Sequence, residues 1–511
     1  MQDVQQLTAP PRVRSNSAVS SNVLIGVILI VVILVGGYFR FVGLNWDDFT
    51  HLHPDERFMT DVVQGLGRQL NPSGDDLSRT EQIADCLARY PDTGGKGSFF
   101  DARCSPWNPL NANSSHGLYV YGTLPLFMAR GAAELVSAGT EWYATNVAGT
   151  PDYDGSHWTS YDGVHLVWRF ISALCEMSAI VLVFAIGTKL HDKWIGLLAA
   201  VLYASTVFSI QMAHFATVDS ISNFYTTLAI YFAVCVQRSG KIRDYALFGV
   251  MVGAAVASRI NLAPLAGLIV IAAAIQLMPA FDSKTSSAER SRLWTIHLTG
   301  LVLSGFCAFL VFRVANPYTF TGPGFFGLMP YSRWLDNMGT AQALNSGAID
   351  SPPNFQWVAR AAYLFPLNNM VVWGMGIPLG IASWMAWGVA GYRLVRGRPA
   401  ALANILLFAW ILVYFGWMGR NWVTTMRYFI PIYPALVLLA AWGLMSLYRS
   451  ARGYRRTVAG VLIGVTAVFT VVWALMFTNI YRNMLTRVQA SYWVWENVSG
   501  DFSMNIETAD G

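Results

Sequence analysis

Eleven long apolar runs restrict the folds available to this chain. Each run is long enough for a membrane-spanning helix, which needs about 20 predominantly apolar residues. Backbone polar groups inside a bilayer must be paired within the protein, and runs of this length favour helices over barrel strands. The sequence therefore predicts an all-α integral membrane protein of about 11 transmembrane helices, over residues 22–39, 163–187, 194–215, 221–237, 245–260, 262–280, 295–315, 366–391, 401–418, 429–447 and 457–478.

The composition supports a membrane protein. Hydrophobic types make up 54% of the 511 residues and charged types 12%, whereas about one-quarter of a soluble domain is charged. These values exclude an ordinary soluble enzyme, a disordered chain and a disulfide-rich secreted scaffold. The 19 Trp residues suit aromatic belts at two membrane surfaces. No nucleic-acid motif accompanies the net charge of +5, so no nucleic acid partner is expected.

The positions of Lys and Arg predict the orientation, because cytoplasmic loops carry an excess of them. With a cytoplasmic N-terminus, half of the 34 Lys and Arg residues fall in short cytoplasmic segments. We expect a multi-pass protein of the cell membrane in three parts. These are a cytoplasmic tail at 1–21, a transmembrane domain at 22–478 with outer loops 40–162 and 316–365, and an extracytoplasmic tail at 479–511.

The first outer loop is expected to carry interfacial helices. Residues 117–138 are moderately apolar but include Arg130 and Glu134. Counting them as a twelfth span would invert the orientation of everything downstream, so we predict a helix lying in the outer interface. Cys86 and Cys104 share this loop and could form a disulfide if it faces an oxidising compartment. Their spacing alone does not decide between a disulfide and two free thiols.

The first outer loop opens with a concentration of polar residues at Asn45–Phe58. Here His53 ends a loop and Pro54 suits the first position of a helix, so Asp55 and Glu56 fall in its first turn. Acids at that place stabilise a helix without any function. A carboxylate at the membrane surface can also reach both a lipid headgroup and a water-side acceptor. The sequence therefore leaves open whether Asp55 and Glu56 only stabilise the helix or take part in a reaction.

Two further span ends carry candidate residues. Asp219 lies between the third and fourth spans, on the same predicted face as Asp55, and either caps a helix or supports proton abstraction. Arg259 and Asn261 follow the fifth span, where a cation either snorkels to headgroups or holds a lipid phosphate. Glu176 lies two turns below Arg169, about 11 Å away, so it needs another partner and is interpreted as structural.

The remaining outer cations lie at span ends, where anchoring is the common role. They are Arg313, Arg420 and Arg427. His51 and His53 near Asp55 match no standard ligand spacing, so no metal is expected. Motifs for nucleotide binding or serine hydrolysis are absent from the sequence.

The layout resembles the GT-C superfamily of integral-membrane glycosyltransferases, and most closely the protein O-mannosyltransferases and the lipid A aminoarabinose transferase. The resemblance rests on one span, a long outer loop opening with Asp55-Glu56, a surface helix and a second outer acid. The stretch Gly43–Phe58 looks like phospholipid-carrier-dependent glycosyltransferases, and Arg427–Pro434 is similar to their late-span motif.

The resemblance implies a GT-C bundle that transfers a sugar, mannose or similar, from a polyprenyl-phosphate carrier, with inversion, to an acceptor hydroxyl at the outer face. Asp55, Glu56 and Asp219 match the catalytic acids. The implied substrate-binding residues are His53, Arg57, Arg259, Asn261, Arg427 and Tyr428. No cofactor beyond the donor lipid is implied, and the acceptor is a protein or a glycolipid.

One departure concerns the phosphate. The aminoarabinose transferase has a basic residue before the proline that opens its surface helix, whereas Tyr121–Pro125 has none. Arg130 or Arg259 is then the substitute. Two other functions remain as alternatives, a secondary transporter or lipid flippase and a non-catalytic membrane subunit. The lack of a visible internal repeat weakens the transporter.

Overall fold

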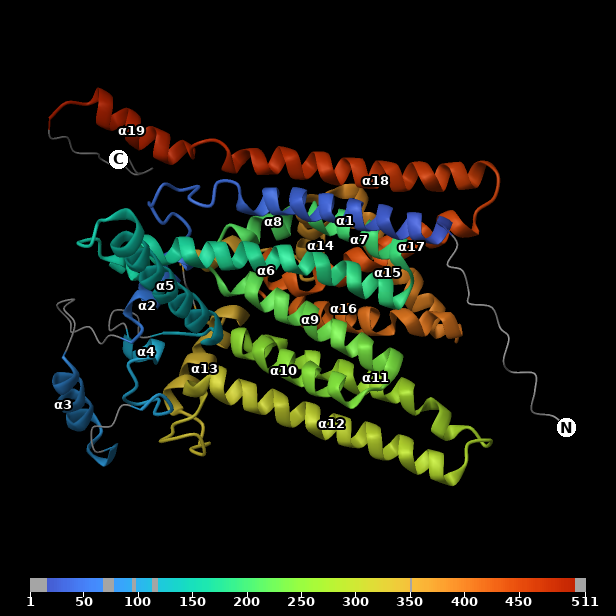
Figure 1. The fold of residues 1–511 in the computed structure, drawn as a ribbon, viewed down its shortest axis with the longest axis horizontal. Coiled ribbons are helices and arrows are strands. Elements are labelled where there is room, and N and C mark those ends of the chain that lie inside the picture. Colours follow the sequence, from blue (N-terminus) through green and yellow to red (C-terminus); the bar gives the residue numbers. More distant parts are fainter. Residues whose placement is uncertain (1–15, 68–77, 94–97, 113–117, 350–351, 501–511) are drawn as a thin grey trace.

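The computed structural model describes residues 16–67, 78–93, 98–112, 118–349 and 352–500. Figure 1 shows long helices running side by side along one axis, with shorter ones gathered at one end. The bundle helices are α1 (Asn16–Phe41), α6 (Tyr161–Leu190), α7 (Lys193–Ala204), α8 (Val207–Ala213), α9 (Val218–Ser239), α10 (Ile242–Ser258), α11 (Gly267–Leu277), α12 (Ser287–Ala315), α14 (Leu364–Asn369), α15 (Ile377–Val395), α16 (Ile405–Met418), α17 (Tyr433–Ser450) and α18 (Tyr454–Thr478).

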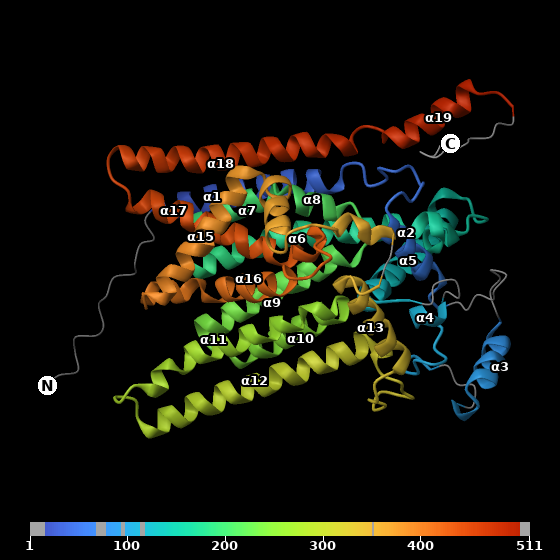
Figure 2. The same ribbon diagram turned by 180° about the vertical axis from the view of Figure 1, so that it is seen from behind.

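The shorter helices come from the segments predicted to lie outside the membrane. They are α2 (Pro54–Gly65), α3 (Arg79–Arg89), α4 (Pro109–Ala112), α5 (Leu124–Tyr143), α13 (Ser332–Ser346) and α19 (Thr486–Asn497). In both ribbon views all six lie toward the same end of the bundle (Figures 1 and 2). The two long outer loops and the tail therefore share one side, as the predicted alternation of spans requires.

All eleven predicted spans are helical in the structure, although not all are equally apolar. Within the described residues, seven helices are long and apolar enough to cross a membrane, or eight if one bent pair counts as a span. The protein is thus a multi-pass membrane protein. Three predicted spans, at α9, α10 and α14–α15, lie outside this set, so the count of eleven stays a prediction.

The third predicted span is broken rather than continuous. Between α7 and α8 the helix axis bends by 59°, at Ser205 and Thr206. The buried guanidinium of Arg40 donates to the carbonyl oxygens of Ala204 at 2.8 Å and Tyr203 at 3.2 Å. Arg40 thereby satisfies carbonyls that the break frees, as a broken helix within a membrane requires.

The predicted surface helix begins later than expected. Residues 118–123 are not helical, because Gly122 is pressed against the end of α10: its N–H donates to the Ser258 carbonyl, and a Cβ there would lie 1.9 Å from the Ala257 oxygen. Helix α5 then starts beside Pro125 and runs across the bundle end (Figure 1). Arg130 pairs with Glu134 and donates to the Gln64 carbonyl at 2.8 Å, which ties α5 to α2.

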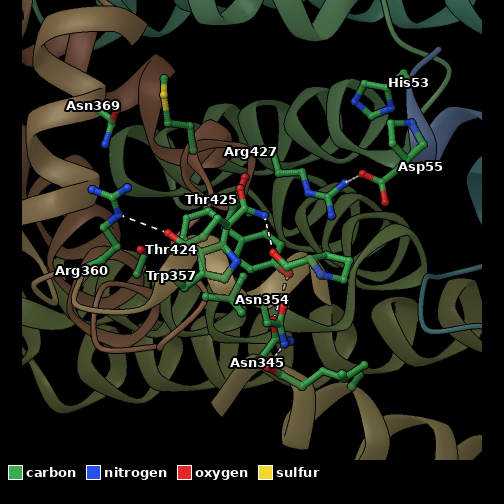
Figure 3. A pocket seen from close by; sticks show the side chains of 18 of the residues that line it. His53, Asp55, Asn345, Asn354, Trp357, Arg360, Asn369, Thr424, Thr425 and Arg427 are labelled. Carbon is green, nitrogen blue, oxygen red and sulfur yellow. Dashed lines mark hydrogen bonds and ion pairs between the residues drawn. The ribbon is translucent and has the colours of Figure 1, made fainter. Parts of the chain in front are cut away.

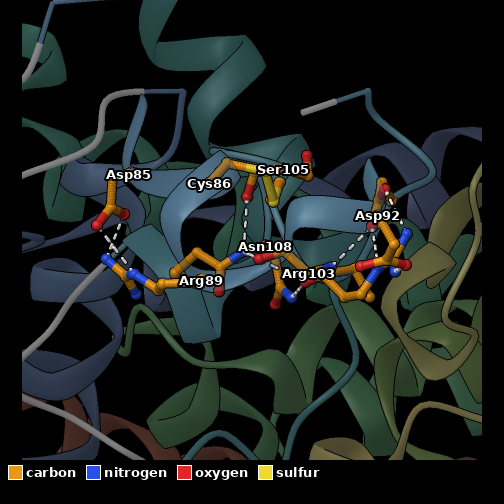
Figure 4. The surroundings of a disulfide bond; sticks show 11 residues. Asp85, Cys86, Arg89, Asp92, Arg103, Ser105 and Asn108 are labelled. Carbon is orange, nitrogen blue, oxygen red and sulfur yellow. Dashed lines mark hydrogen bonds and ion pairs between the residues drawn. A yellow bond between two sulfur atoms is a disulfide. The ribbon is translucent and has the colours of Figure 1, made fainter. Parts of the chain in front are cut away.

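Cys86 and Cys104 form a disulfide that joins α3 to the following loop (Figure 4). The Ser78 and Glu81 side chains cap the start of α3 reciprocally. Beside the disulfide, Arg103 binds Asp92 at 2.6 Å and Asp101 at 3.1 Å. The sequence left this pairing open; a disulfide is the state expected in an oxidising compartment, which agrees with an outer location for the loop.

Candidate functional site

Helix α2 begins as the sequence predicts, and its first turn carries the leading candidate. His53 is the N-cap, and its Nδ1 accepts a hydrogen bond from the Glu56 N–H at 3.2 Å. Burial lowers the pKa of His53 below its usual value, which favours the neutral ring that this acceptor role requires. Pro54 occupies the first helical position, and Asp55 and Glu56 follow it.

The loop before α2 holds an unusual backbone conformation. Asp48, Phe49 and His51 have φ values of 47°, 60° and 48°, in the left-handed region that non-glycine residues rarely enter. Such residues cluster at functional sites, where the surrounding structure enforces them. Asp48 accepts a hydrogen bond from the Tyr492 hydroxyl of α19 at 2.7 Å, so the C-terminal tail helps to hold this loop.

Asp55 lies in the wall of a cavity of about 830 Å³. The cavity is bordered by the start of α2, by α8, by residues 341–345 and 353–365 of the second outer segment, by Asn369 at the end of α14 and by residues 423–428. Figure 3 shows Asp55 directed at the guanidinium of Arg427, with which it forms an ion pair. The Asp55 side chain is 36% exposed, so this carboxylate is reachable from the cavity.

A chain of contacts leads from Asp55 to the second predicted acid. Arg427 lies over the ring of Tyr428, and the Arg259 guanidinium contacts the same ring, 5.1 Å from its centroid. Arg259 forms an ion pair with Asp219, and its Nη1 is 3.4 Å from the Arg427 carbonyl. Asp219 and Arg259 are buried behind the cavity wall rather than part of it. The structure thus brings both acids into one network but exposes only Asp55.

Glu56 belongs to a different, fully buried cluster on the other side of α2. Its Oε1 accepts from Arg169 Nε at 2.6 Å, and Arg169 also binds Asp47 through two hydrogen bonds of 2.9 Å. All three side chains are shielded from solvent. Burial raises the pKa of Glu56 to about 7 although Arg169 opposes this. For Asp47, burial also acts to raise the pKa, but the hydrogen bonds and the positive charge of Arg169, together with the Leu52 N–H, outweigh it and lower the pKa.

Two predicted substrate-binding residues do not reach the cavity. Arg57 is exposed and lies outside the cavity lining. Asn261 also lies outside it; its Nδ2 is 3.9 Å from Met418 Sδ, and its buried Oδ1 has no hydrogen-bond partner within the described residues. His53, Arg427 and Tyr428 do line the cavity.

Other predicted roles are resolved by specific contacts. Arg313 is buried and donates to the carbonyl oxygens of Gly324 and Phe325, so it fixes an outer loop rather than meeting lipid headgroups. Arg130 is engaged with α2 and lies outside the cavity. Glu176 accepts from the Tyr203 hydroxyl at 2.7 Å and from Asn223 at 2.9 Å, which confirms that Arg169 is not its partner.

Sequence reasoning missed two sets of residues. One is Arg169 with Asp47; an arginine within an apolar span is itself a signal, since intramembrane charges are costly and need a partner. The other is the cavity wall supplied by the second outer segment and by α14, including Asn345, Asn354, Trp357, Arg360 and Asn369. Its only sequence signal is an aromatic and amide-rich stretch in an outer loop.

Within the described part of the chain, no group of three or more His, Cys, Asp or Glu side chains is arranged to hold a metal ion. What the fold and cavity define is a multi-pass helical membrane protein with a cavity at the end of the bundle that carries the outer segments, and Asp55 is the one carboxylate among the described residues that line it.

Comparisons with known proteins assign this architecture. Residues 162–312 match the family model described as dolichyl-phosphate-mannose-protein mannosyltransferase. This range holds Arg169, Asp219 and Arg259 but neither Asp55 nor Arg427. No curated protein matches the chain in sequence.

Two solved structures share the fold across nearly the whole chain. The Archaeoglobus fulgidus oligosaccharyltransferase AglB, in complex with an inhibitory peptide and a dolichol-phosphate, has a TM-score of 0.55 at 14% identity, covering 94% of this chain and 58% of AglB. ArnT from Cupriavidus metallidurans bound to undecaprenyl phosphate has a TM-score of 0.50 at 12% identity, covering 93% of this chain and 80% of ArnT. The chain therefore has the fold that AglB and ArnT share, which confirms the GT-C fold class expected from the sequence. It spans about 58% of the length of AglB.

Proposed function

We propose that the protein is an inverting glycosyltransferase that moves a sugar, mannose or a similar one, from a polyprenyl-phosphate carrier to an acceptor hydroxyl at the outer membrane face. The GT-C fold supports a lipid-linked donor, since AglB and ArnT were solved with dolichol-phosphate and undecaprenyl phosphate. The orientation, with a cytoplasmic N-terminus and an extracytoplasmic site, is part of the proposal and rests on the Lys and Arg distribution.

The observation that carries the proposal is the position of Asp55. It is the only carboxylate among the described residues that line the cavity, and it is paired with a guanidinium. A general base must be ionised and within reach of the proton that it accepts. The nearby acids Asp47, Glu56 and Asp219 are all buried, so none of them meets this requirement in the same way.

The reaction balances with Asp55 as the base. The acceptor oxygen attacks the anomeric carbon while its proton passes to the Asp55 carboxylate. The bond between the anomeric carbon and the phosphate oxygen breaks, and the carrier leaves as polyprenyl phosphate. Arg427 stabilises the charge that grows on this phosphate, since a guanidinium binds phosphate oxygens through paired donors. This leaving group demands no metal or other cofactor.

The buried residues have a supporting role in this proposal. Asp219 fixes Arg259, which contacts the Tyr428 ring and the Arg427 carbonyl. Asp219 and Arg259 are thus positioning residues, and Glu56 positions α2 through Arg169. Arg57 and Asn261, which lie outside the cavity, have no part in substrate binding here.

A lipid flippase is the second candidate, and the break between α7 and α8 favours it. Broken helices beside a cavity are typical of transporters, and Phe208, Gln211 and Met212 near this break line the cavity. Glycosyl transfer in detergent micelles separates the two functions, because micelles have no second compartment into which a lipid could be moved.

The test is sugar transfer from a labelled polyprenyl-phosphate sugar by the full chain in detergent, with an extract of outer-envelope acceptors. Wild type should transfer the label, while Asp55→Asn and Arg427→Gln should not. Asp336→Asn, an exposed change on α13, is the matched control and should keep wild-type activity. Equal transfer by wild type and Asp55→Asn at matched folding would refute Asp55 as the base, whereas no transfer by wild type would favour a non-catalytic subunit.

A further inference from the structure

We propose that the half of the cavity formed by the second outer segment is a carbohydrate subsite, and that the acceptor is therefore a sugar hydroxyl rather than a protein hydroxyl. This inference rests on the proposed function and names the acceptor class that it leaves open. It is carried by Trp357, by three oriented amides and by the rigid attachment of the segment that bears them.

The subsite lies apart from the reacting carboxylate. In Figure 3, Asp55 and His53 are on one side of the cavity, whereas Trp357, Arg360 and Asn369 are on the other. The volume of about 830 Å³ is near the upper end of the range for pockets that hold drug-sized ligands. One sugar on a phosphate, placed beside Asp55 and Arg427, leaves the far half for the acceptor.

The amides of this half are held with one end free. The Asn345 Oδ1 accepts from the Tyr428 hydroxyl at 3.0 Å, while Asn354 and Asn369 donate through Nδ2 to the carbonyls of Leu344 at 3.2 Å and Phe365 at 2.8 Å. The opposite ends, Asn345 Nδ2 and the two Oδ1 atoms, have no partner within the described residues. Sugar hydroxyls both donate and accept, so one oriented donor and two oriented acceptors match them.

An aromatic and a cation complete the subsite. The rings of Trp357 and Phe365 meet edge to face at 6.1 Å, and the Arg360 guanidinium lies 4.9 Å from the Phe365 centroid. Arg360 Nε donates to the Gln356 carbonyl at 3.2 Å, and its terminal nitrogens are without a carboxylate partner in the described ranges. An aromatic face suits the apolar C–H face of a sugar ring, and the free guanidinium donors suit ring or hydroxyl oxygens.

The segment is held firmly at both ends. Tyr363 donates its backbone N–H to the Gly419 carbonyl at 2.9 Å and its hydroxyl to the Gly416 carbonyl at 3.0 Å. At the other end the Val423 N–H donates to the Asn345 carbonyl. Ala359 and Tyr363, on either side of Arg360, have φ values of 60° and 61°, a conformation that persists where surrounding contacts enforce it. The wall is thus preorganised, which favours specific binding.

The lining favours a sugar over a peptide. One recurring mode of peptide binding adds a strand to a sheet edge, and in the described ranges no strand borders this cavity to support that mode. A site whose oriented amides hydrogen-bond to the hydroxyls of a ligand strongly rejects molecules that lack those hydroxyls. Five amide side chains line the cavity, and they are Gln211, Asn345, Asn354, Gln356 and Asn369.

The test measures binding without catalysis. Full-length Asp55→Asn protein in detergent is titrated with methyl mannobioside, methyl arabinobioside and a ten-residue Ser/Thr-rich peptide, and binding is followed by saturation-transfer NMR. At least one glycoside should bind and the peptide should not. Trp357→Leu in the same background should weaken glycoside binding about tenfold or more, while Trp357→Phe, which keeps a ring, should lose less. Trp373→Leu, an exposed change outside the cavity, is the matched control and should bind as the parent does.

Three results would overturn the inference. They are binding of the peptide alone, glycoside binding that Trp357→Leu leaves unchanged, and displacement of the glycoside by the polyprenyl-phosphate sugar, which would assign the subsite to the donor. Failure of the proposed function gives a different result, in which wild type transfers no sugar. Glycoside binding that depends on Trp357 would then still support a carbohydrate subsite.

Discussion

Asp55 and Glu56 are neighbours in the sequence but belong to two regions with opposite properties. Asp55 faces an open cavity and one arginine, while Glu56 is sealed between helices with Asp47 and Arg169. Successive residues of an α-helix point about 100° apart, so one turn of α2 serves both regions. The comparison teaches that an acidic pair at a helix start need not act as a pair: one member is available for chemistry and the other holds the helix in place.

The largest expected effect tests the cavity side of this comparison. Asp55→Asn keeps the shape of the side chain but removes the base, and general base catalysis is worth about 10²- to 10⁴-fold in rate. Transfer from the labelled donor should fall by that factor, with an unchanged melting temperature in detergent. A fall of less than tenfold would mean that Asp55 is not the base.

The next effect tests the buried side. Arg169→Leu leaves Asp47 and Glu56 buried without their cation, and breaking a buried ion pair in this way costs about 3–5 kcal/mol. The melting temperature should drop by many degrees, and the yield of folded protein with it. Arg420→Leu, an exposed change at the end of α16, is the control. Equal stability of the two variants would contradict a structural role for the cluster.

A smaller effect concerns the pH dependence of stability. Because the pKa of Glu56 in the folded state is raised to about 7 from an ordinary value of 4.5, its protonated form favours folding. The contribution is fully present below pH 4.5 and is lost as the pH rises through 7. Glu56→Gln should remove this part of the pH dependence of stability, while the ion pair between Asp47 and Arg169 is kept. The measurement is the melting temperature of wild type and variant between pH 4.5 and 8. If the two melting temperatures change with pH in the same way, Glu56 is not the source of this pH dependence.

The smallest effect belongs to the next residue of the same turn. Arg57 is exposed and outside the cavity, so Arg57→Gln should change transfer by less than about twofold, as exposed charges contribute little. The sequence resemblance gave Arg57 a substrate-binding role. Loss of transfer comparable to that of Arg427→Gln would restore that role and weaken the distinction between the two sides of α2.

Much of the fold follows from the sequence, because hydropathy determines it. Every apolar run is helical over most of its length, and the outer segments share one end of the bundle, as the charge alternation requires (Figure 2). The break between α7 and α8 was not predicted. The local sequence there is apolar and helix-compatible, and the bend depends on Arg40, more than 160 residues earlier in the chain.

The site was predictable only where the chemistry is local. His53, Pro54 and Asp55 form a cap and a first turn that the sequence itself specifies. Which acid faces the cavity depends on how α2 packs against α6, and nothing in the Asp-Glu pair determines that. The partnership of Asp55 with Arg427 joins residues 372 positions apart, and the wall at Trp357 comes from a third segment. These contacts are set by tertiary packing.

The ion pair between Asp55 and Arg427 has a consequence for the order of events. In the cavity the Asp55 carboxylate is engaged by the Arg427 guanidinium. In the proposed reaction, the phosphate of the donor competes with Asp55 for Arg427 and thereby releases the carboxylate as a proton acceptor. The ion pair therefore favours a sequence in which the donor binds before the acceptor is deprotonated.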